Sequence, residues 1–145
     1  MNWARHVTLA SMVLLHIACS ASEGAGNADA GFPRSPYVSL VSDSGKLRIE
    51  IRTAPDQPPT RGTSSVEMRV VEVATETPVD GIAFTVVPWM PAHGHGSSVK
   101  PTVTAAGGGR YVLTNVDLFM PGRWELRTTF SGGANDSAAP AFDVQ

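Results

Sequence analysis

Cysteine, charge and helix-favouring residues are all scarce in this sequence of 145 residues. A single cysteine cannot form an internal disulfide, and it excludes metal or redox sites built from cysteine pairs. Charged residues make up 17%, with 11 basic against 13 acidic, so the chain lacks the basic excess that nucleic-acid binding needs. Glycine (14) and proline (11) are frequent while Glu, Lys and Leu are few, which argues against a helical bundle.

Motifs of the common enzyme classes are also missing. The sequence contains no Gly-x-Ser-x-Gly elbow of a hydrolase, no phosphate-binding loop and no dinucleotide-binding fingerprint. The glycines at 107–109 lie between two predicted strands, which is typical of a hairpin turn and not of a phosphate cradle. Asp80 and Asp117 are isolated in the sequence, so no paired-carboxylate site is indicated. We therefore expect a protein that is not an enzyme.

The first 18 residues have the pattern of an export signal. Arg5 and His6 give a short positive start, and residues 7–18 form an apolar run of about a dozen residues. A membrane-spanning helix needs about 20 apolar residues, so this run predicts a signal peptide and not a transmembrane anchor.

Cys19 directly follows this run and resembles the lipid-modified cysteine of bacterial lipoproteins. Ala18 suits the small residue required before that cysteine, whereas His16 stands where leucine is usual. An acylated Cys19 would anchor the chain to a membrane, and Ser20, in place of an aspartate that favours inner-membrane retention, favours the outer membrane. The alternative is that Cys19 is incidental and that signal peptidase cuts after a nearby Ala-x-Ala-like triplet.

Composition divides the rest of the chain into two parts. Residues 20–35 are rich in Ser, Ala and Gly, which predicts a flexible tether. The remaining residues are enough for one domain with a real core and too few for two. We therefore predict a signal peptide (1–18), a tether that begins at lipidated Cys19 (19–36) and one folded domain (37–145).

Within the domain, apolar residues recur at every second position. Leu47, Ile49 and Ile51 alternate with charged residues, and the same period returns several times toward the C-terminus. A change of phase at Val71 predicts a β-bulge, and two prolines and two glycines predict a loop at 88–98. Turns separate these segments at intervals of about 10–15 residues, which predicts an all-β fold, an antiparallel immunoglobulin-like β-sandwich of about seven strands.

His93 and His95 are the only histidines of the predicted domain, and they are candidate metal ligands. In an extended chain, a His-x-His pair has both rings on one side, with Cα atoms about 7 Å apart. Met90 and Met120 offer thioethers, and imidazole with thioether and no thiolate suits copper, the soft sulfur favouring Cu(I). Trp89 is expected either in the core or over this loop, where its ring could shield a bound Cu(I). The alternative is a polar turn with methionines that fill the core.

The same region resembles the YtkA-like domain family, to which the FixH proteins are related. The likeness covers residues 66–130, and its most specific segments are Met90-Pro-Ala-His-Gly-His-Gly, Gly-Arg-Tyr111 and Leu-Phe-Met-Pro-Gly-Arg-Trp124. Members are small β-sandwiches of the cell envelope, associated with copper handling and cytochrome oxidase assembly. His93 is a departure, because many members have a methionine there, and its harder nitrogen would shift the preference toward Cu(II).

The resemblance implies a binding role for Met90, His95 and Met120. We therefore expect an exported, membrane-anchored domain that binds copper for carriage or hand-over, with a copper chaperone, an oxidase assembly factor or an efflux component as partner. The alternative is a metal-free interaction or adhesion module that uses residues 88–98 or a sheet edge as its contact surface. A Met120 turn at the opposite end of the sandwich from the histidines would remove most support for a shared site.

Overall fold

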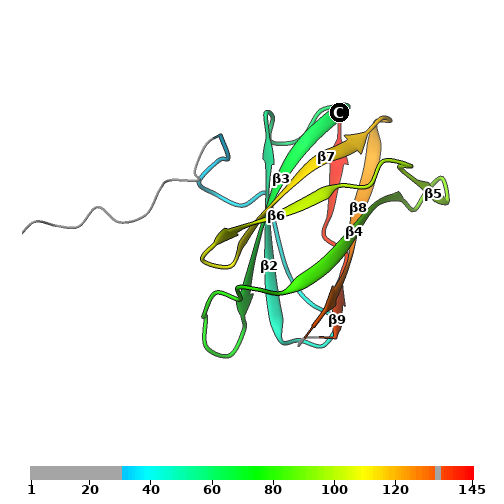
Figure 1. Ribbon diagram of the computed structural model, residues 1–145. Helices are drawn as coiled ribbons and strands as arrows, with labels where there is room; N and C mark the ends of the chain where they lie inside the picture. The colour runs from blue at the N-terminus through cyan, green and yellow to red at the C-terminus, as the bar shows by residue number, and fades with distance from the viewer. Residues whose placement is uncertain (1–30, 133–134) are drawn as a thin grey trace, which may run out of the picture.

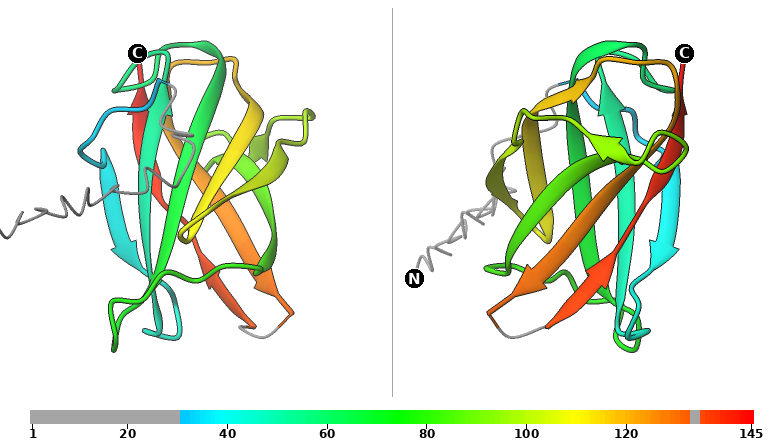
Figure 2. Two further views of the ribbon diagram at one scale, coloured as in Figure 1. Left: turned by 60° about the vertical axis from the view of Figure 1, so that its left-hand side comes forward. Right: turned by 90° about the vertical axis from the view of Figure 1, so that its right-hand side faces the viewer.

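The computed structural model describes residues 31–132 and 135–145, which form two antiparallel β-sheets packed face to face (Figures 1 and 2). Each sheet has five strands, and the described residues contain no helix, so the predicted all-β sandwich is confirmed. In particular, no helix in these ranges is long and apolar enough to cross a membrane. The predicted signal peptide and Cys19 lie outside the described residues.

The first sheet, sheet A, has the strand order β1-β2-β3-β7-β6. Its strands are β1 (Val38–Val41), β2 (Leu47–Ala54), β3 (Gly62–Glu72), β6 (Thr102–Gly107) and β7 (Arg110–Leu118). The second, sheet B, has the order β10-β8-β4-β5, and β9 also pairs with β8. Its strands are β4 (Ala83–Met90), β5 (His95–Gly96), β8 (Gly122–Ser131), β9 (Asp136–Ala138) and β10 (Ala141–Val144). The total exceeds the predicted seven, and β5 and β9, with two and three residues, are too short to show alternation.

Alternate residues of both sheets fill the space between them. Along β2, Leu47, Ile49 and Ile51 are buried, and the charged residues between them face outward. From β8, Trp124 and Phe130 are buried against this face. Each such side chain stabilises the fold by about 1.5–3 kcal/mol when it leaves water, so the period-two pattern accounts for the sandwich.

The predicted bulge lies at a different place. Strand β3 pairs with β2 in one unbroken register, and its register shifts against β7 between Ser64 and Val66. Val71 is buried on the opposite face from its neighbour Val70 because the segment after β3 turns back over it and forms a bridge through Pro78. The change of phase at Val71 therefore reflects a second apolar contact and not an extra residue.

The predicted loop at 88–98 is also shorter than expected. Strand β4 continues through Pro88 and Trp89 to Met90, and the chain then turns and pairs back as β5. Pro88 fits into the strand because sheet B has its edge on this side, where the missing N–H breaks no ladder within the sheet.

Strands β4 and β6 are edges of their sheets. Strand β4 pairs with β8 along most of its length but with β5 only at Trp89 and Met90, and β6 pairs only with β7. Between the two edges lies a cavity of about 470 Å³, whose lining includes Phe84, Val86 and Lys100. The two sheets are therefore not fully closed along this side of the sandwich.

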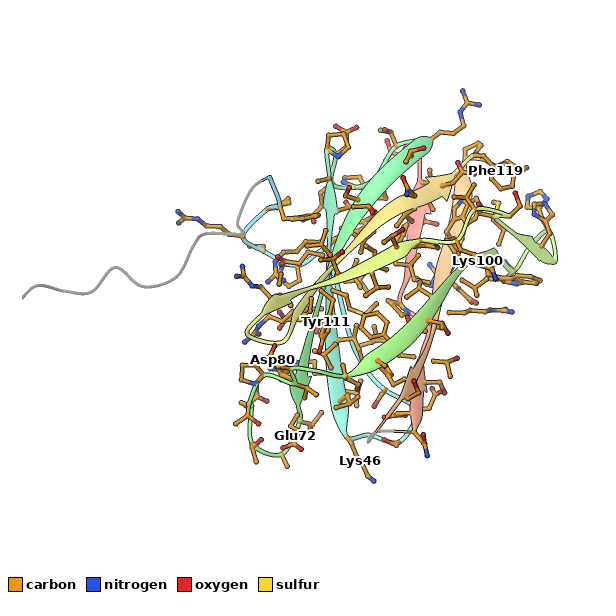
Figure 3. All side chains as sticks on the ribbon, viewed as in Figure 1. Lys46, Glu72, Asp80, Lys100, Tyr111 and Phe119 are labelled. Atoms are coloured by element: carbon orange, nitrogen blue, oxygen red, sulfur yellow. The ribbon has the colours of Figure 1, made fainter. Side chains whose placement is uncertain are left out.

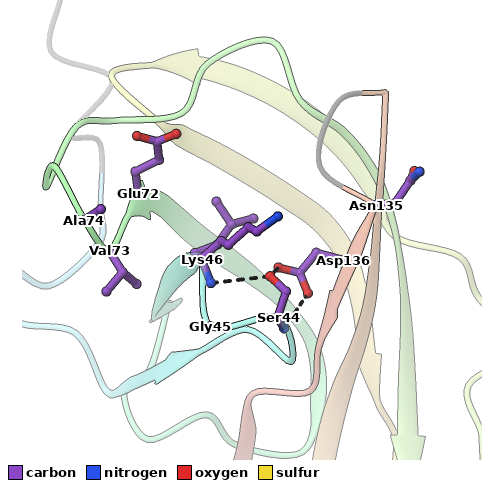
Figure 4. A pocket seen from close by; sticks show the side chains of 9 residues that line it. Ser44, Gly45, Lys46, Glu72, Val73, Ala74, Asn135 and Asp136 are labelled. Carbon is purple, nitrogen blue, oxygen red and sulfur yellow. Dashed lines mark hydrogen bonds between the residues drawn. The ribbon is translucent and has the colours of Figure 1, made fainter.

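The two ends of the sandwich carry different groups. Phe119, in the connection between β7 and β8, lies at the end where β5 projects, and Lys46 and Glu72 lie at the other end (Figure 3). At the Lys46 end, the β1–β2 turn is joined to β9 because Ser44 donates to Asp136 from its backbone N–H (3.0 Å) and its hydroxyl (2.6 Å) (Figure 4).

Gly109 occupies the tightest backbone position of the β6–β7 hairpin. Its N–H donates to Asp80 Oδ1 (2.9 Å), and its carbonyl accepts from the N–H of Val70 (2.8 Å). Its φ is +71°, and a Cβ at this position would lie 2.4 Å from the Val70 carbonyl oxygen. Neighbouring Gly108 also has a positive φ (+64°), but a Cβ there would meet nothing within 4 Å.

These two glycines form a matched pair for a stability test. Gly108→Ala is expected to lower the free energy of unfolding by about 1 kcal/mol, the cost of a left-handed conformation for alanine. Gly109→Ala adds the clash with Val70 and should cost about 3 kcal/mol or more. Urea unfolding of both variants measures the difference, and equal losses would show that the close approach at Gly109 has no energetic weight.

The carboxyl of Asp136 is expected to stabilise the fold in a pH-dependent way. Burial alone would raise its pKa, but hydrogen bonds from Ser42, Ser44 and the Ser137 backbone outweigh burial and hold the pKa at about 2. Since the unfolded value is about 3.9, the stabilisation is present above pH 4 and is lost as the pH falls toward 2. The difference in unfolding free energy between wild type and Asp136→Asn should therefore shrink from pH 5 to pH 2. An NMR titration midpoint near 3.9 for Asp136 would contradict this.

Candidate metal centre

A tight turn between β4 and β5 positions the two histidines. The N–H groups of His93 (3.2 Å) and Gly94 (3.0 Å) both donate to the carbonyl of Met90, and Gly94 has a φ of +65°. The two histidines therefore do not share one extended segment, because His93 lies in the turn and His95 begins β5, where it pairs with Met90. The turn nevertheless brings their rings together.

Strand β5 lies unusually close to β4. A Cβ on Gly96 would lie 2.3 Å from the Pro88 carbonyl oxygen, and the N–H of Ser97 donates to that same oxygen (3.1 Å). The Ser97 hydroxyl also donates to Asp117 Oδ2 (3.1 Å) and so ties the segment after β5 to strand β7. These contacts fix the base of the turn that carries His93 and His95.

The imidazoles of His93 and His95 face the same exposed region. Their ring centroids are 5.6 Å apart, and both residues are exposed. The ring of Phe119 stacks on His95, with centroids 5.9 Å apart and an interplanar angle of 16°. One face of His95 is therefore covered by an aromatic ring, while His93 remains open.

The Met120 turn lies at the same end of the sandwich as the histidines. The rings of Phe119 and the buried Trp124 form a T-shaped contact with centroids 5.4 Å apart, and the Trp124 indole N–H donates to the Met120 carbonyl (2.9 Å). A Cβ on Gly122 would lie 3.3 Å from the terminal methyl of Met90, so the β7–β8 turn also packs onto β4. A Met120 turn at the opposite end of the sandwich, which would have removed most support for a shared site, is therefore not found.

The four candidate ligands differ in exposure. His93 and His95 are exposed, Met120 is half-buried against the core, and Met90 is only 1% exposed. The structure thus brings the two imidazoles together at the surface and leaves the Met90 thioether in the core beneath. Among the described residues, no group of three or more His, Cys, Asp or Glu side chains could hold a metal ion.

Phe119 is the residue of this region that sequence reasoning missed as a site residue. The feature of the sequence that indicates Phe119 is a large apolar residue at a position that alternation turns outward. Leu118 before it is buried, and Phe119 itself is 41% exposed. Such exposure of a large ring beside a polar turn is the feature that would have identified it.

Trp89 lies outside the core. Because side chains alternate along a strand and Met90 takes the inner face, Trp89 points to the outer face of sheet B. There the guanidinium carbon of Arg127 lies 4.5 Å from its ring centroid, which is a cation–π contact. The prediction that Trp89 belongs to the core is therefore wrong, and its ring lies instead against Gly96 of the predicted loop, where a Cβ would be 3.1 Å from it.

A separate cavity of about 540 Å³ lies at the opposite end of the sandwich, beside Lys46, Glu72 and Asp136 (Figure 4). Its charged lining contains one lysine and two acids and no histidine or methionine. It therefore takes no part in the candidate metal centre.

Comparisons with known proteins give one family and one structural likeness. No curated protein matches the sequence. A copper-bound variant of FetP from uropathogenic Escherichia coli is similar in structure, with a TM-score of 0.49 and 6% identity over 75% of this chain and 95% of that chain. The YtkA-like family pattern matches residues 42–129, from the β1–β2 turn into β8, which is more than half of the chain. The chain therefore belongs to the YtkA-like family.

Proposed function

We propose that this chain is an exported, lipid-anchored protein of the bacterial cell envelope that binds one copper ion through His93 and His95, with Met120 or Met90 completing the ligand set. The ion is cargo, which the domain carries and hands over to a partner. The protein has no catalytic role in this proposal.

The observation that carries the proposal is the spacing of the two imidazoles. An ion bound by one nitrogen of each ring at about 2.0 Å lies about 3.1 Å from each centroid, so a shared ion needs centroids about 4.4 Å (right angle) to about 6.2 Å (linear) apart. The observed separation is 5.6 Å. The separation therefore lies within the range that a shared ion needs.

The donor types favour copper over zinc. Zinc sites use three or four nitrogen, thiolate or carboxylate ligands, and no third such side chain joins His93 and His95 in the described part of the chain. Thioethers beside imidazoles suit Cu(I), and the histidine at position 93 adds a harder donor that suits Cu(II). Both oxidation states are therefore tested below.

An exposed site of few ligands suits hand-over. His93 is open to solvent, so a partner's ligand can approach the ion from that side while Phe119 covers His95. Ligands can then be exchanged one at a time, which keeps the ion bound throughout. A copper chaperone, an oxidase assembly factor or an efflux component would be a suitable partner.

A titration of the full chain in an uncharged detergent tests this function. Cys19→Ser is made first so that its thiol does not compete, and Cu(I), under a competing chelator, and Cu(II) are added separately. One equivalent is expected to bind. His93→Ala and His95→Ala should each weaken binding at least about tenfold, which corresponds to about 1.4 kcal/mol, and the double variant should not bind.

Ser98→Ala is the matched control, because Ser98 is exposed in the same segment and should leave affinity unchanged. Circular dichroism of each variant checks the fold. A folded double-histidine variant that still binds one equivalent would contradict the assignment. Failure of the parent to bind either ion would favour the alternative, a metal-free interaction module.

The anchor has its own test. In a bacterial host that processes lipoproteins, the wild-type chain is expected in the membrane fraction, with Cys19 as an acylated N-terminus by mass spectrometry. Cys19→Ser should move the protein to the soluble fraction, because two or more acyl chains supply the membrane affinity. A mature N-terminus beyond residue 19 would rule out lipidation.

A further inference from the structure

We propose that the outer face of sheet A binds phosphate, either as the free ion or as a phosphate monoester headgroup, in an arginine-lined cavity. This site shares no residue with the candidate metal centre. The cavity has a volume of about 320 Å³ and is lined by Pro33, Arg34, Arg52, Glu67, Arg69 and Arg110. Four arginines thus meet here in a chain whose net charge is −2.

The carboxylates of this face do not balance its arginines. Arg52 is well paired, with nitrogens 3.3 Å from Glu50 and 3.3 Å from Glu67, and its Nε donates to the Arg34 carbonyl (3.2 Å). The same two glutamates are 3.5 Å from Arg69 and 3.9 Å from Arg110. Arg69 and Arg110 are therefore only loosely paired, and guanidinium donors of both are available to a ligand.

The register of the sheet puts Arg69 and Arg110 side by side. They are direct partners across β3 and β7, where two like charges destabilise the pairing. Both side chains are partly buried, at 32% and 29% exposure. An anion between them would remove the repulsion, and paired guanidinium groups match the oxygens of a phosphate.

Glu67 supplies the second, independent sign of a ligand. The residue is 3% exposed, and its Oε2 makes no hydrogen bond among the described residues, its cation Arg110 being 3.9 Å away, while Oε1 accepts from Arg52. A buried carboxylate oxygen without a donor is unfavourable. Monohydrogen phosphate carries a P–OH group that can donate to this oxygen, and so does a phosphate monoester in its monoprotonated form, whose second pKa is about 6. Sulfate at neutral pH has no such proton. The site should therefore prefer phosphate to sulfate.

Two sources of a phosphate group are compatible with the position of the cavity. Pro33 and Arg34 form one wall, at the end of the predicted tether, and Gln57 holds the next residue through its side chain, which donates to the Ser35 carbonyl (3.1 Å). A soluble phosphate can enter from solvent, and a lipid headgroup can enter if the chain is anchored through Cys19.

Titration with inorganic phosphate and, separately, sodium sulfate at low ionic strength tests the site. The full chain is used in an uncharged detergent, with heat and amide NMR shifts as readouts. Phosphate is expected to bind saturably and at least about tenfold more tightly than sulfate, with shifts centred on residues 67–69 and 110. Arg69→Gln and Arg110→Gln should each weaken phosphate binding about tenfold or more, and Glu67→Gln should abolish the preference over sulfate.

Arg61→Gln is the matched control, because it removes the same charge from an exposed position outside the cavity and should change affinity little. The fold should survive Arg69→Gln and Arg110→Gln, since each removes one of two like charges that face each other. Equal affinity for phosphate and sulfate, an equal loss in Arg61→Gln, or no saturable binding of phosphate would each overturn the proposal.

Vesicle sedimentation of Cys19→Ser, which lacks the lipid attachment point, separates the two sources. Retention on phosphatidic acid in phosphatidylcholine, but not on phosphatidylglycerol in phosphatidylcholine, would assign the site to a monoester headgroup, provided that Arg69→Gln abolishes it. Saturable phosphate binding without such retention would assign it to the free ion. Equal retention on both vesicles would indicate adsorption by charge alone and would overturn the proposed site.

Discussion

The buried indole of Trp124 connects the interior of this sandwich to its histidine-bearing end. Its ring is part of the core, its N–H donates to the Met120 carbonyl, and it makes a T-shaped contact with Phe119. The Phe119 ring in turn stacks on His95. The hydrophobic burial that holds the two sheets together therefore also fixes the position of the turn and of one imidazole.

Period-two alternation predicted the fold because it is a local property that each buried strand must show. It placed the inward face of β2 correctly. It could not predict the turn after Met90, because glycine and proline signal a change of direction without its geometry. The histidine pair was therefore recognisable from sequence. The arrangement of the two rings and the contact of Phe119 with His95 were not, because they depend on how the β4–β5 turn packs against the β7–β8 connection.

The pairing of Arg69 with Arg110 was even less predictable from sequence. The two residues are far apart in sequence, and nothing in either strand indicates that they become direct partners. That relation depends on the register between β3 and β7, and the shift between Ser64 and Val66 alters this register. Electrostatic features of a sheet face arise from register, so they cannot be read from alternation alone.

The open edge of β4 has a consequence for many copies held at one surface. Unpaired strand edges are templates for intermolecular pairing, and a membrane that concentrates the chain would increase the rate of such encounters. Pro88 offers no N–H, and its carbonyl is already taken by Ser97, so the edge is closed at its C-terminal end. Lys100 places a positive charge beside the remaining part. The Ser97 contact that fixes the base of the histidine turn thus also caps one end of the exposed β4 edge.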